Sequence, residues 1–152
     1  MCIRDSMHAE IPVLNPANVQ ELLDFGLYGW ALSRYSGLWA AMKTITETVG
    51  SSVSVHVDTH RLTIVRPDDF ETPPDGLHIR LHDWPPLGAE IRFQRYKVYA
   101  ALAFARANGI DRAVIDSRDR RFGIVTTGKS YLDVMQALED LGIDEDLSLI
   151  HI

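Results

Sequence analysis

The stretch NVQELLDFGLYGWALSRYSGLWAAMK, residues 18–43, decides the fold. Asn18 is a favourable N-cap and Glu21 follows three residues later, an arrangement in which side chains satisfy the free N–H groups at a helix start. Gly37 supplies a left-handed stop, and Leu38 follows it as the apolar residue of a Schellman motif. Residues 38–42 are apolar on both faces, as in a strand buried in a parallel sheet. Helix, glycine stop and buried strand predict one half of an α/β unit.

Two stripes run along this predicted helix. Apolar residues recur at helical spacing and predict its buried face; they are Val19, Leu23, Leu27 and Trp30. A second stripe of small residues consists of Gly26, Gly29 and Ser33. Because glycine lowers helix propensity, this second stripe predicts close packing against another part of the backbone.

The middle of the chain predicts short strands and a linker. Valines alternate with polar residues over residues 53–57, and residues 62–65 form a second short apolar run, with a polar turn between the two. Residues 66–87 hold five of the seven prolines, which resist both helix and central strand. We therefore expect an inter-domain linker there, with one short strand over residues 77–82.

The last third predicts a long helix followed by a strand and a second helix. Residues 88–108 are rich in alanine, and the following Gly109 supplies a Schellman stop. Residues 122–127, FGIVTT, predict a strand, and Ser130 with Asp133 is expected to cap the helix that follows and ends at a third such stop. The buried face of that helix is predicted to consist of Tyr131, Val134, Met135 and Leu138.

Both ends of the chain are predicted to derive from a DNA adapter. Residues 1–6, MCIRDS, can be encoded by ATG TGT ATA AGA GAC AG, and the reverse complement of that DNA encodes residues 147–151 and allows Ile152. Such an inverted repeat resembles a transposon adapter used in DNA library preparation. We therefore expect residues 7–146 to be an internal gene fragment, and both ends to make little buried contact with it.

Composition narrows the class of protein. The net charge is −6 and stays so without the two ends, which argues against a nucleic-acid or anionic-membrane surface. No apolar run approaches the roughly 20 residues that span a bilayer. The single cysteine, Cys2, lies in the adapter segment, so no thiol chemistry, disulfide framework or cysteine metal site is expected.

Residues 123–130, GIVTTGKS, formally fit the P-loop pattern. In a true P-loop the strand ends before the first glycine, and the next four residues cradle phosphate. Here those four residues, 124–127, have strand character, so we expect them to be paired in a sheet. A milder alternative remains open, in which Gly128 and Ser130 at the helix start hold an anion. The favoured interpretation is an ordinary βα turn.

Histidine spacings also suggest metal ligands. On a strand, residues four apart, such as His56 with His60 or His78 with His82, lie about 13 Å apart, too far for one ion. Only neighbours two apart, such as His56 with Asp58, are spaced for chelation. A solvated strand face is the favoured interpretation, and no metal site is predicted.

Arg34, Tyr35 and Lys43 flank the Gly37 stop. Cations near a helix C-terminus usually interact with its dipole. Arg34 and Lys43 are weak candidates for cofactor binding. No catalytic residue is predicted, because neither a Ser-His-Asp set nor a nucleophile elbow is recognisable.

Three stretches carry a family resemblance. They are PANVQELLDFGLYGWALSRYSGLWAAMKTITETV, YKVYAALAFARANGIDRAVIDS and FGIVTTGKSYLDVMQALEDLGID, which together span nearly all of residues 16–144. In this order they resemble the fused bacterial indolepyruvate ferredoxin oxidoreductases, of the 2-oxoacid:ferredoxin oxidoreductase family.

The resemblance implies an α/β fold built from parts of two domains. Residues 7–65 would end a thiamine-diphosphate-binding fold on its pyrimidine side, and residues 66–121 would be a linker and connecting helix. Residues 122–146 would supply the first βα unit of a domain like the C-terminal domain of transketolase. The remaining residues, 1–6 and 147–152, would be adapter.

The resemblance also implies a reaction and its cofactors. The parent protein would oxidatively decarboxylate indolepyruvate or a related arylpyruvate in the cytoplasm, transfer the acyl group to coenzyme A and pass electrons to ferredoxin. It would use thiamine diphosphate, Mg²⁺ and 4Fe-4S clusters, and would be a homo-oligomer. In that family the activating glutamate lies upstream of Asn18, and the Gly-Asp-Gly diphosphate motif lies beyond Asp146. The fragment alone is therefore expected to be inactive.

Three alternatives stay open. The first is a related enzyme that acts on another 2-oxoacid. The second is a P-loop nucleotide-binding module built on residues 123–130, and the third is a non-catalytic interaction domain.

Overall fold

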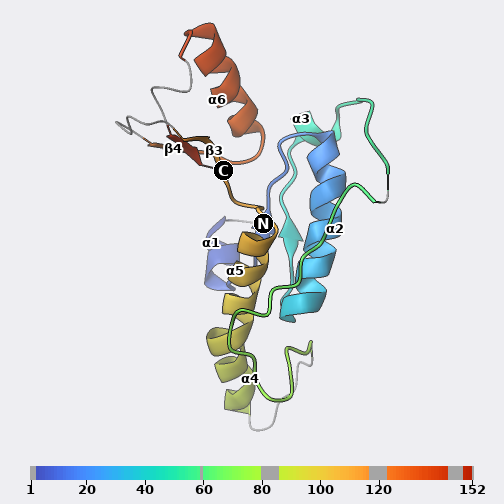
Figure 1. Cartoon of the computed structure of the whole chain (residues 1–152), viewed down its shortest axis with the longest axis vertical. Helices are drawn as coiled ribbons and strands as arrows, with labels where there is room; N and C mark the ends of the chain where they lie inside the picture. The colour runs from blue at the N-terminus through green and yellow to red at the C-terminus, as the bar shows by residue number, and fades with distance from the viewer. Residues whose placement is uncertain (1–2, 59, 80–85, 117–122, 144–148, 152) are drawn as a thin grey trace.

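The computed structural model describes residues 3–58, 60–79, 86–116, 123–143 and 149–151. Two separate sheets lie in this part of the chain (Figure 1). In the first, β1 (Val13–Leu14) pairs in parallel with β2 (Ala41–Met42). In the second, β5 (Leu149–His151) lies between β3 (Ala113–Asp116) and β4 (Gly123–Val125), antiparallel to β3 and parallel to β4. The expected mixture of helices and strands is confirmed, and the strands form two sheets; their assignment to two domains stays a prediction.

The longest helix, α2 (Val19–Ser36), begins as its sequence predicts. Asn18 Oδ1 accepts the Glu21 N–H of the first turn at 2.9 Å, and Glu21 Oε2 accepts the N–H of Ala17, the residue before the N-cap, at 2.8 Å. Gly37 ends the helix with φ 71° and donates to the Ser33 carbonyl at 3.0 Å. The Schellman prediction is wrong here, because the next N–H, of Leu38, donates to Ser36 Oγ at 3.2 Å.

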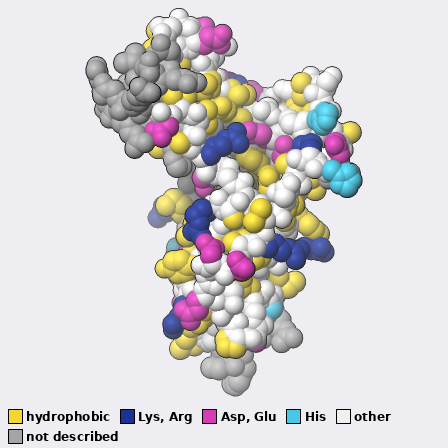
Figure 2. All heavy atoms as spheres, viewed as in Figure 1, with side chains coloured by type: hydrophobic (Ala, Val, Ile, Leu, Met, Phe, Trp, Pro, Cys, Tyr) yellow, Lys and Arg dark blue, Asp and Glu magenta, His cyan; other side chains and the backbone are white. Residues whose placement is uncertain are grey.

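The predicted buried face of α2 is wrong. Leu27 and Trp30 are 52% and 67% exposed. Figure 2 shows one face of the molecule, on which apolar side chains lie among charged ones. The small-residue stripe faces the first sheet instead, since a Cβ on Gly29 would lie 2.8 Å from Leu14 Cδ1. The buried residues of the helix are Leu32 and Ser36. The close approach at Gly29 thus confirms the predicted close packing of the small-residue stripe.

The strand prediction for residues 38–42 holds only at its end. Within this stretch β2 comprises Ala41 and Met42, which are half-buried, whereas Trp39 is 74% exposed. The apolar run is therefore not a strand covered on both faces. After β2 the chain forms the short helix α3 (Thr46–Val49).

The predicted alanine-rich helix is confirmed and starts slightly earlier than expected. It consists of α4 (Pro86–Arg92), one π-helical turn, η1 (Phe93–Lys97), and α5 (Val98–Ala107). Its Schellman stop is confirmed by bonds from Gly109 N to Arg106 O and from Ile110 N to Ala105 O, at 3.2 and 3.1 Å. α5 packs beside α2, and their shared core consists of Leu32, Leu38, Ala101 and Phe104.

Residues 53–79, here called the strap, replace the predicted short strands. No regular strand or helix occurs in the strap's described residues, so the strands predicted over 53–57 and 62–65 are wrong, and of 77–82 the described part, 77–79, is not a strand. The predicted turn is present, with Arg61 N donating to Asp58 O at 3.4 Å. In Figure 1 the green trace passes along α2 and α5 toward α4.

The helix α6 (Lys129–Asp140) follows β4 after Gly128. The predicted Ser130 cap is wrong, because the helix begins one residue earlier and has no side-chain cap. Its predicted buried face is confirmed: Leu138 is 7% exposed and the other three residues are half-buried. Its Schellman stop is also confirmed, with Ile143 N donating to Leu138 O at 2.9 Å.

The chain ends make more contact than predicted. Ser6, in the N-terminal helix α1 (Ile3–His8), is 6% exposed, and β5 pairs with two strands. The expectation of little buried contact is therefore wrong, while the adapter origin of the two ends remains a prediction. In the part of the chain that the structure describes, no helix has the length and apolar character needed to cross a membrane.

Candidate functional site

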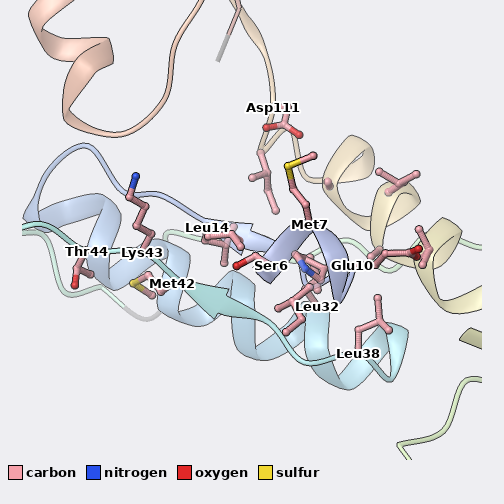
Figure 3. A pocket seen from close by; sticks show the side chains of 18 residues that line it. Ser6, Met7, Glu10, Leu14, Leu32, Leu38, Met42, Lys43, Thr44 and Asp111 are labelled. Carbon is pink, nitrogen blue, oxygen red and sulfur yellow. The ribbon is translucent and has the colours of Figure 1, made fainter. Parts of the chain in front are cut away.

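An apolar cavity of about 780 Å³ lies among the described residues (Figure 3). Its walls come from α1, the β1–β2 pair, α2, α5 and the turn that follows α5. Most of the lining is aliphatic; the apolar residues include Ile11, Val13, Leu14, Leu32, Leu38, Met42, Val98, Ala101, Leu102 and Ile110. Such a cavity accommodates an apolar group and offers few polar atoms to orient it.

Polar groups at this cavity carry charges of both signs. Lys43 lies at one end and Leu38 at the other, as Figure 3 shows, and Glu10 and Asp111 also line the hollow. The Lys43 N–H donates to Leu14 O at 2.8 Å, so the β1–β2 pairing fixes its backbone while its side chain stays exposed. Glu10 accepts a hydrogen bond from Gln94 Nε2 at 3.0 Å. These groups do not form a nucleophile-and-base pair.

The two predicted cofactor-binding candidates are not brought together. Arg34 is exposed on α2, and its guanidinium carbon lies 5.1 Å from the ring centroid of Trp30, a cation–π geometry. Lys43 lines the apolar cavity, and Arg34 is not among its lining residues. Their proposed role in cofactor binding stays a prediction.

The P-loop look-alike has the geometry of a strand followed by a turn. Ile124 pairs with Ile150 and Val125 with His151 in the β4–β5 ladder, which confirms sheet pairing for the first half of residues 124–127. Thr126 and Thr127 lie beyond the end of β4, so the prediction is wrong for them. Lys129, the lysine of the motif, makes an ion pair with Asp133 on its own helix.

The side chain of Asn15, between β1 and α2, lies over the turn at Gly128. A Cβ on Gly128 would lie 2.6 Å from Asn15 Oδ1, so the amide of Asn15 occupies the space beside the start of α6. The adjoining crevice, of about 500 Å³, is also lined by Glu21 and Asp24. Glu21 caps α2 and Asp24 pairs with Arg61.

The residues present do not fit the metal cofactors that the family resemblance implies. Among the described residues there is no group of three or more His, Cys, Asp or Glu side chains placed to hold a metal ion. An iron–sulfur cluster requires several cysteine thiolates, and the sequence contains a single cysteine. The backbone N–H of His56 donates to Gln20 Oε1 at 2.7 Å, and that of His60 donates to Asp58 Oδ1 at 2.8 Å. These two bonds order the histidine backbones and imply no ligand role.

Sequence reasoning missed the apolar cavity. Its lining residues come from five separate segments, and each segment alone has only the apolar character of an ordinary helix or strand. Local periodicity therefore contained no signal for it.

The comparison with known families bears on the C-terminal part of the chain. Residues 112–149 match the family model described as the indolepyruvate oxidoreductase domain. The matched range contains β3, β4 and α6 and includes the third stretch of the resemblance. No curated protein and no solved structure matches the chain. The C-terminal part of this protein is thus similar to the indolepyruvate oxidoreductase domain.

Proposed function

We propose that this chain is part of an indolepyruvate ferredoxin oxidoreductase of the fused type. The parent enzyme oxidatively decarboxylates indolepyruvate or a related arylpyruvate, yields the acyl-coenzyme A and reduces ferredoxin. It works in the cytoplasm as a homo-oligomer with thiamine diphosphate, Mg²⁺ and 4Fe-4S clusters. The observation that carries the proposal is the family match over residues 112–149.

The fold is consistent with a piece of two domains. The parallel β1–β2 pair has only two strands, whereas parallel sheets are usually larger and covered on both faces. Side chains such as Trp30 and Trp39 are more than two-thirds exposed beside this sheet. In our proposal these surfaces pack against other parts of the parent enzyme.

The chain's own role in the proposal is structural. Its described residues position two sheets and the helices between them, and its single cysteine cannot ligate a cluster. We therefore propose that the 152-residue chain has no oxidoreductase activity by itself, because thiamine catalysis depends on groups that hold and orient the cofactor.

The test uses the full-length gene that contains the sequence of residues 7–146. The parent protein is expressed anaerobically and loaded with iron, sulfide, thiamine diphosphate and Mg²⁺, and ferredoxin or dye reduction is followed with coenzyme A. Rapid reduction with indolepyruvate and slow reduction with pyruvate would support the proposal. The reverse preference would identify the alternative, an enzyme for another 2-oxoacid. Turnover by the 152-residue chain would refute its structural role.

A further inference from the structure

We propose that the strap, residues 53–79, is a detachable cover that opens as a unit from α2 and α5 while both helices stay folded. The opening uncovers an aromatic cluster that Tyr35 and Phe104 form with Phe70 of the strap. The rings of Tyr35 and Phe104 have centroids 5.7 Å apart, and those of Tyr35 and Phe70 are 6.1 Å apart at an interplanar angle of 72°.

Side chains of α2 and of the α5 C-cap hold the strap, and no strand ladder occurs in its described residues, 53–58 and 60–79. Asn108 binds both backbone groups of Val65: its Oδ1 accepts the N–H at 2.8 Å and its Nδ2 donates to the carbonyl at 2.9 Å. Gln20 binds both backbone groups of His56 in the same way, at 2.7 and 3.3 Å. Each side-chain amide thus replaces the neighbouring strand that a β-strand would require.

Further contacts hold the centre and the last part of the strap. The Tyr35 hydroxyl donates to the Pro67 carbonyl, and Arg106 pairs with Asp69 at 2.7 Å. Together with Val65 and Phe70, these strap residues form a central latch of six consecutive positions. The latch contacts α2 through Tyr35 and the end of α5 through Arg106 and Asn108, so its release separates the strap from both helices.

The strap is less strongly held than the helices beneath it. Most of its attachments are solvent-exposed, and exposed hydrogen bonds and ion pairs contribute little individually. In contrast, Leu32 and Phe104 are 3% and 0% exposed within continuous helical hydrogen-bond ladders. Because local opening requires the least free energy where buried apolar contacts are few, the strap opens before α2 or α5 unfolds.

Native-state proteolysis of the 152-residue chain tests this order of opening. Chymotrypsin recognises Phe70 in the strap and Phe25 and Tyr28 in α2, and mass spectrometry assigns each cut. We expect the first of these cuts after Phe70, with the helical circular dichroism retained. Since cleavage follows the population of the open form, Tyr35→Phe should speed the Phe70 cut about fivefold, and the Phe70 cut should still precede the α2 cuts.

A matched control removes a side-chain hydrogen bond elsewhere. Gln136 donates to Asp140 at 2.9 Å, and both residues lie on α6, so Gln136→Ala should leave the Phe70 cut unchanged. Equal rates of cleavage at Phe70 and in α2 would overturn the proposal, since they mean that the strap opens only on global unfolding.

Amide hydrogen exchange of the unsubstituted chain gives a measurement that needs no variant. The Val65 N–H should exchange more slowly than in a free peptide and faster than the Leu32 N–H inside α2. Exchange of Val65 at the free-peptide rate would show that the strap is not docked. Exchange in step with Leu32 would show that the strap does not open separately. Either result overturns the proposal.

Discussion

Gly37 lies so close to the carbonyl of His78 that no side chain fits between them. A Cβ on Gly37 would be 2.7 Å from the His78 oxygen, and the glycine has φ 71°, a left-handed conformation that side chains disfavour. The end of α2 and the end of the strap therefore meet at a position that requires glycine.

The first prediction follows from this contact. Gly37→Ala should destabilise the chain by about 2–3 kcal/mol, from the left-handed strain and the clash together. The matched control is Gly109→Ala: Gly109 has φ 58° with no atom within 4 Å of its Cβ position, so only the strain of about 1–2 kcal/mol remains. Urea unfolding followed by circular dichroism measures both, and equal losses would show that the His78 contact has no energetic effect.

The second prediction concerns acid stability. Hydrogen bonds from Arg92, at 2.8 and 2.7 Å, lower the pKa of Asp75 from 3.8 to about 2, against a smaller opposing effect of burial. Because the folded pKa is lowered, the stabilisation is complete above about pH 4 and is lost as the pH falls through 2. The thermal midpoint of the unsubstituted chain should drop between pH 4 and 2 more steeply than that of Asp75→Asn. Equal falls in the thermal midpoint of the two proteins between pH 4 and 2 would contradict the stabilising pair of Asp75 with Arg92.

The third prediction concerns alkaline pH. Burial raises the pKa of Tyr35 above its usual 10, and the nearby carboxylates of Asp69 and Asp68 raise it further, although Arg106 pairs with Asp69. A raised pKa means that the neutral hydroxyl stabilises the folded chain below pH 10, and that this stabilisation is lost as the pH rises through the folded pKa. Phenolate absorbance should show one tyrosine titrating late, and Tyr35→Phe should remove that component. A Tyr35→Phe titration identical to that of the unsubstituted chain would contradict the assignment.

Local backbone signals predicted both boundaries of α2 and the C-terminal end of α5. Asn18, Gly37 and Gly109 act within one turn of their own helix, so the residues that decide each boundary are adjacent in sequence. The Leu38 N–H departs from the Schellman pattern because a serine hydroxyl, Ser36 Oγ, competes for it.

Predictions that depend on a distant partner were less successful. The alternating valines at 53–57 have the period of a strand, yet the side chain of Gln20 binds the backbone of His56, and no neighbouring strand is paired there. Likewise, the sequence of α2 offered an apolar stripe and a small-residue stripe, and the close approach of Leu14 to Gly29 selects the small-residue stripe for the sheet. The apolar cavity also depends on contacts between distant segments, and the periodicity of the sequence gives no information about such contacts.

The last prediction tests which face of α5 supports the fold. Leu102 is 59% exposed, whereas Phe104, two residues later on the same helix, is fully buried against α2. Phe104→Ala should therefore cost about 3–5 kcal/mol of unfolding free energy, because it removes buried aromatic area and leaves a cavity beside Leu32 and Tyr35.

Leu102→Ala on the same helix is its control. Because the exposed leucine side chain has little buried area to lose, the decrease in unfolding free energy should stay below about 1 kcal/mol. The higher helix propensity of alanine partly offsets this decrease. Urea unfolding of the two variants, with the slope of the transition compared with that of the unsubstituted chain, measures the difference. A larger loss for Leu102→Ala than for Phe104→Ala would mean that α5 packs through its other face, and would remove the aromatic cluster on which the detachable strap depends.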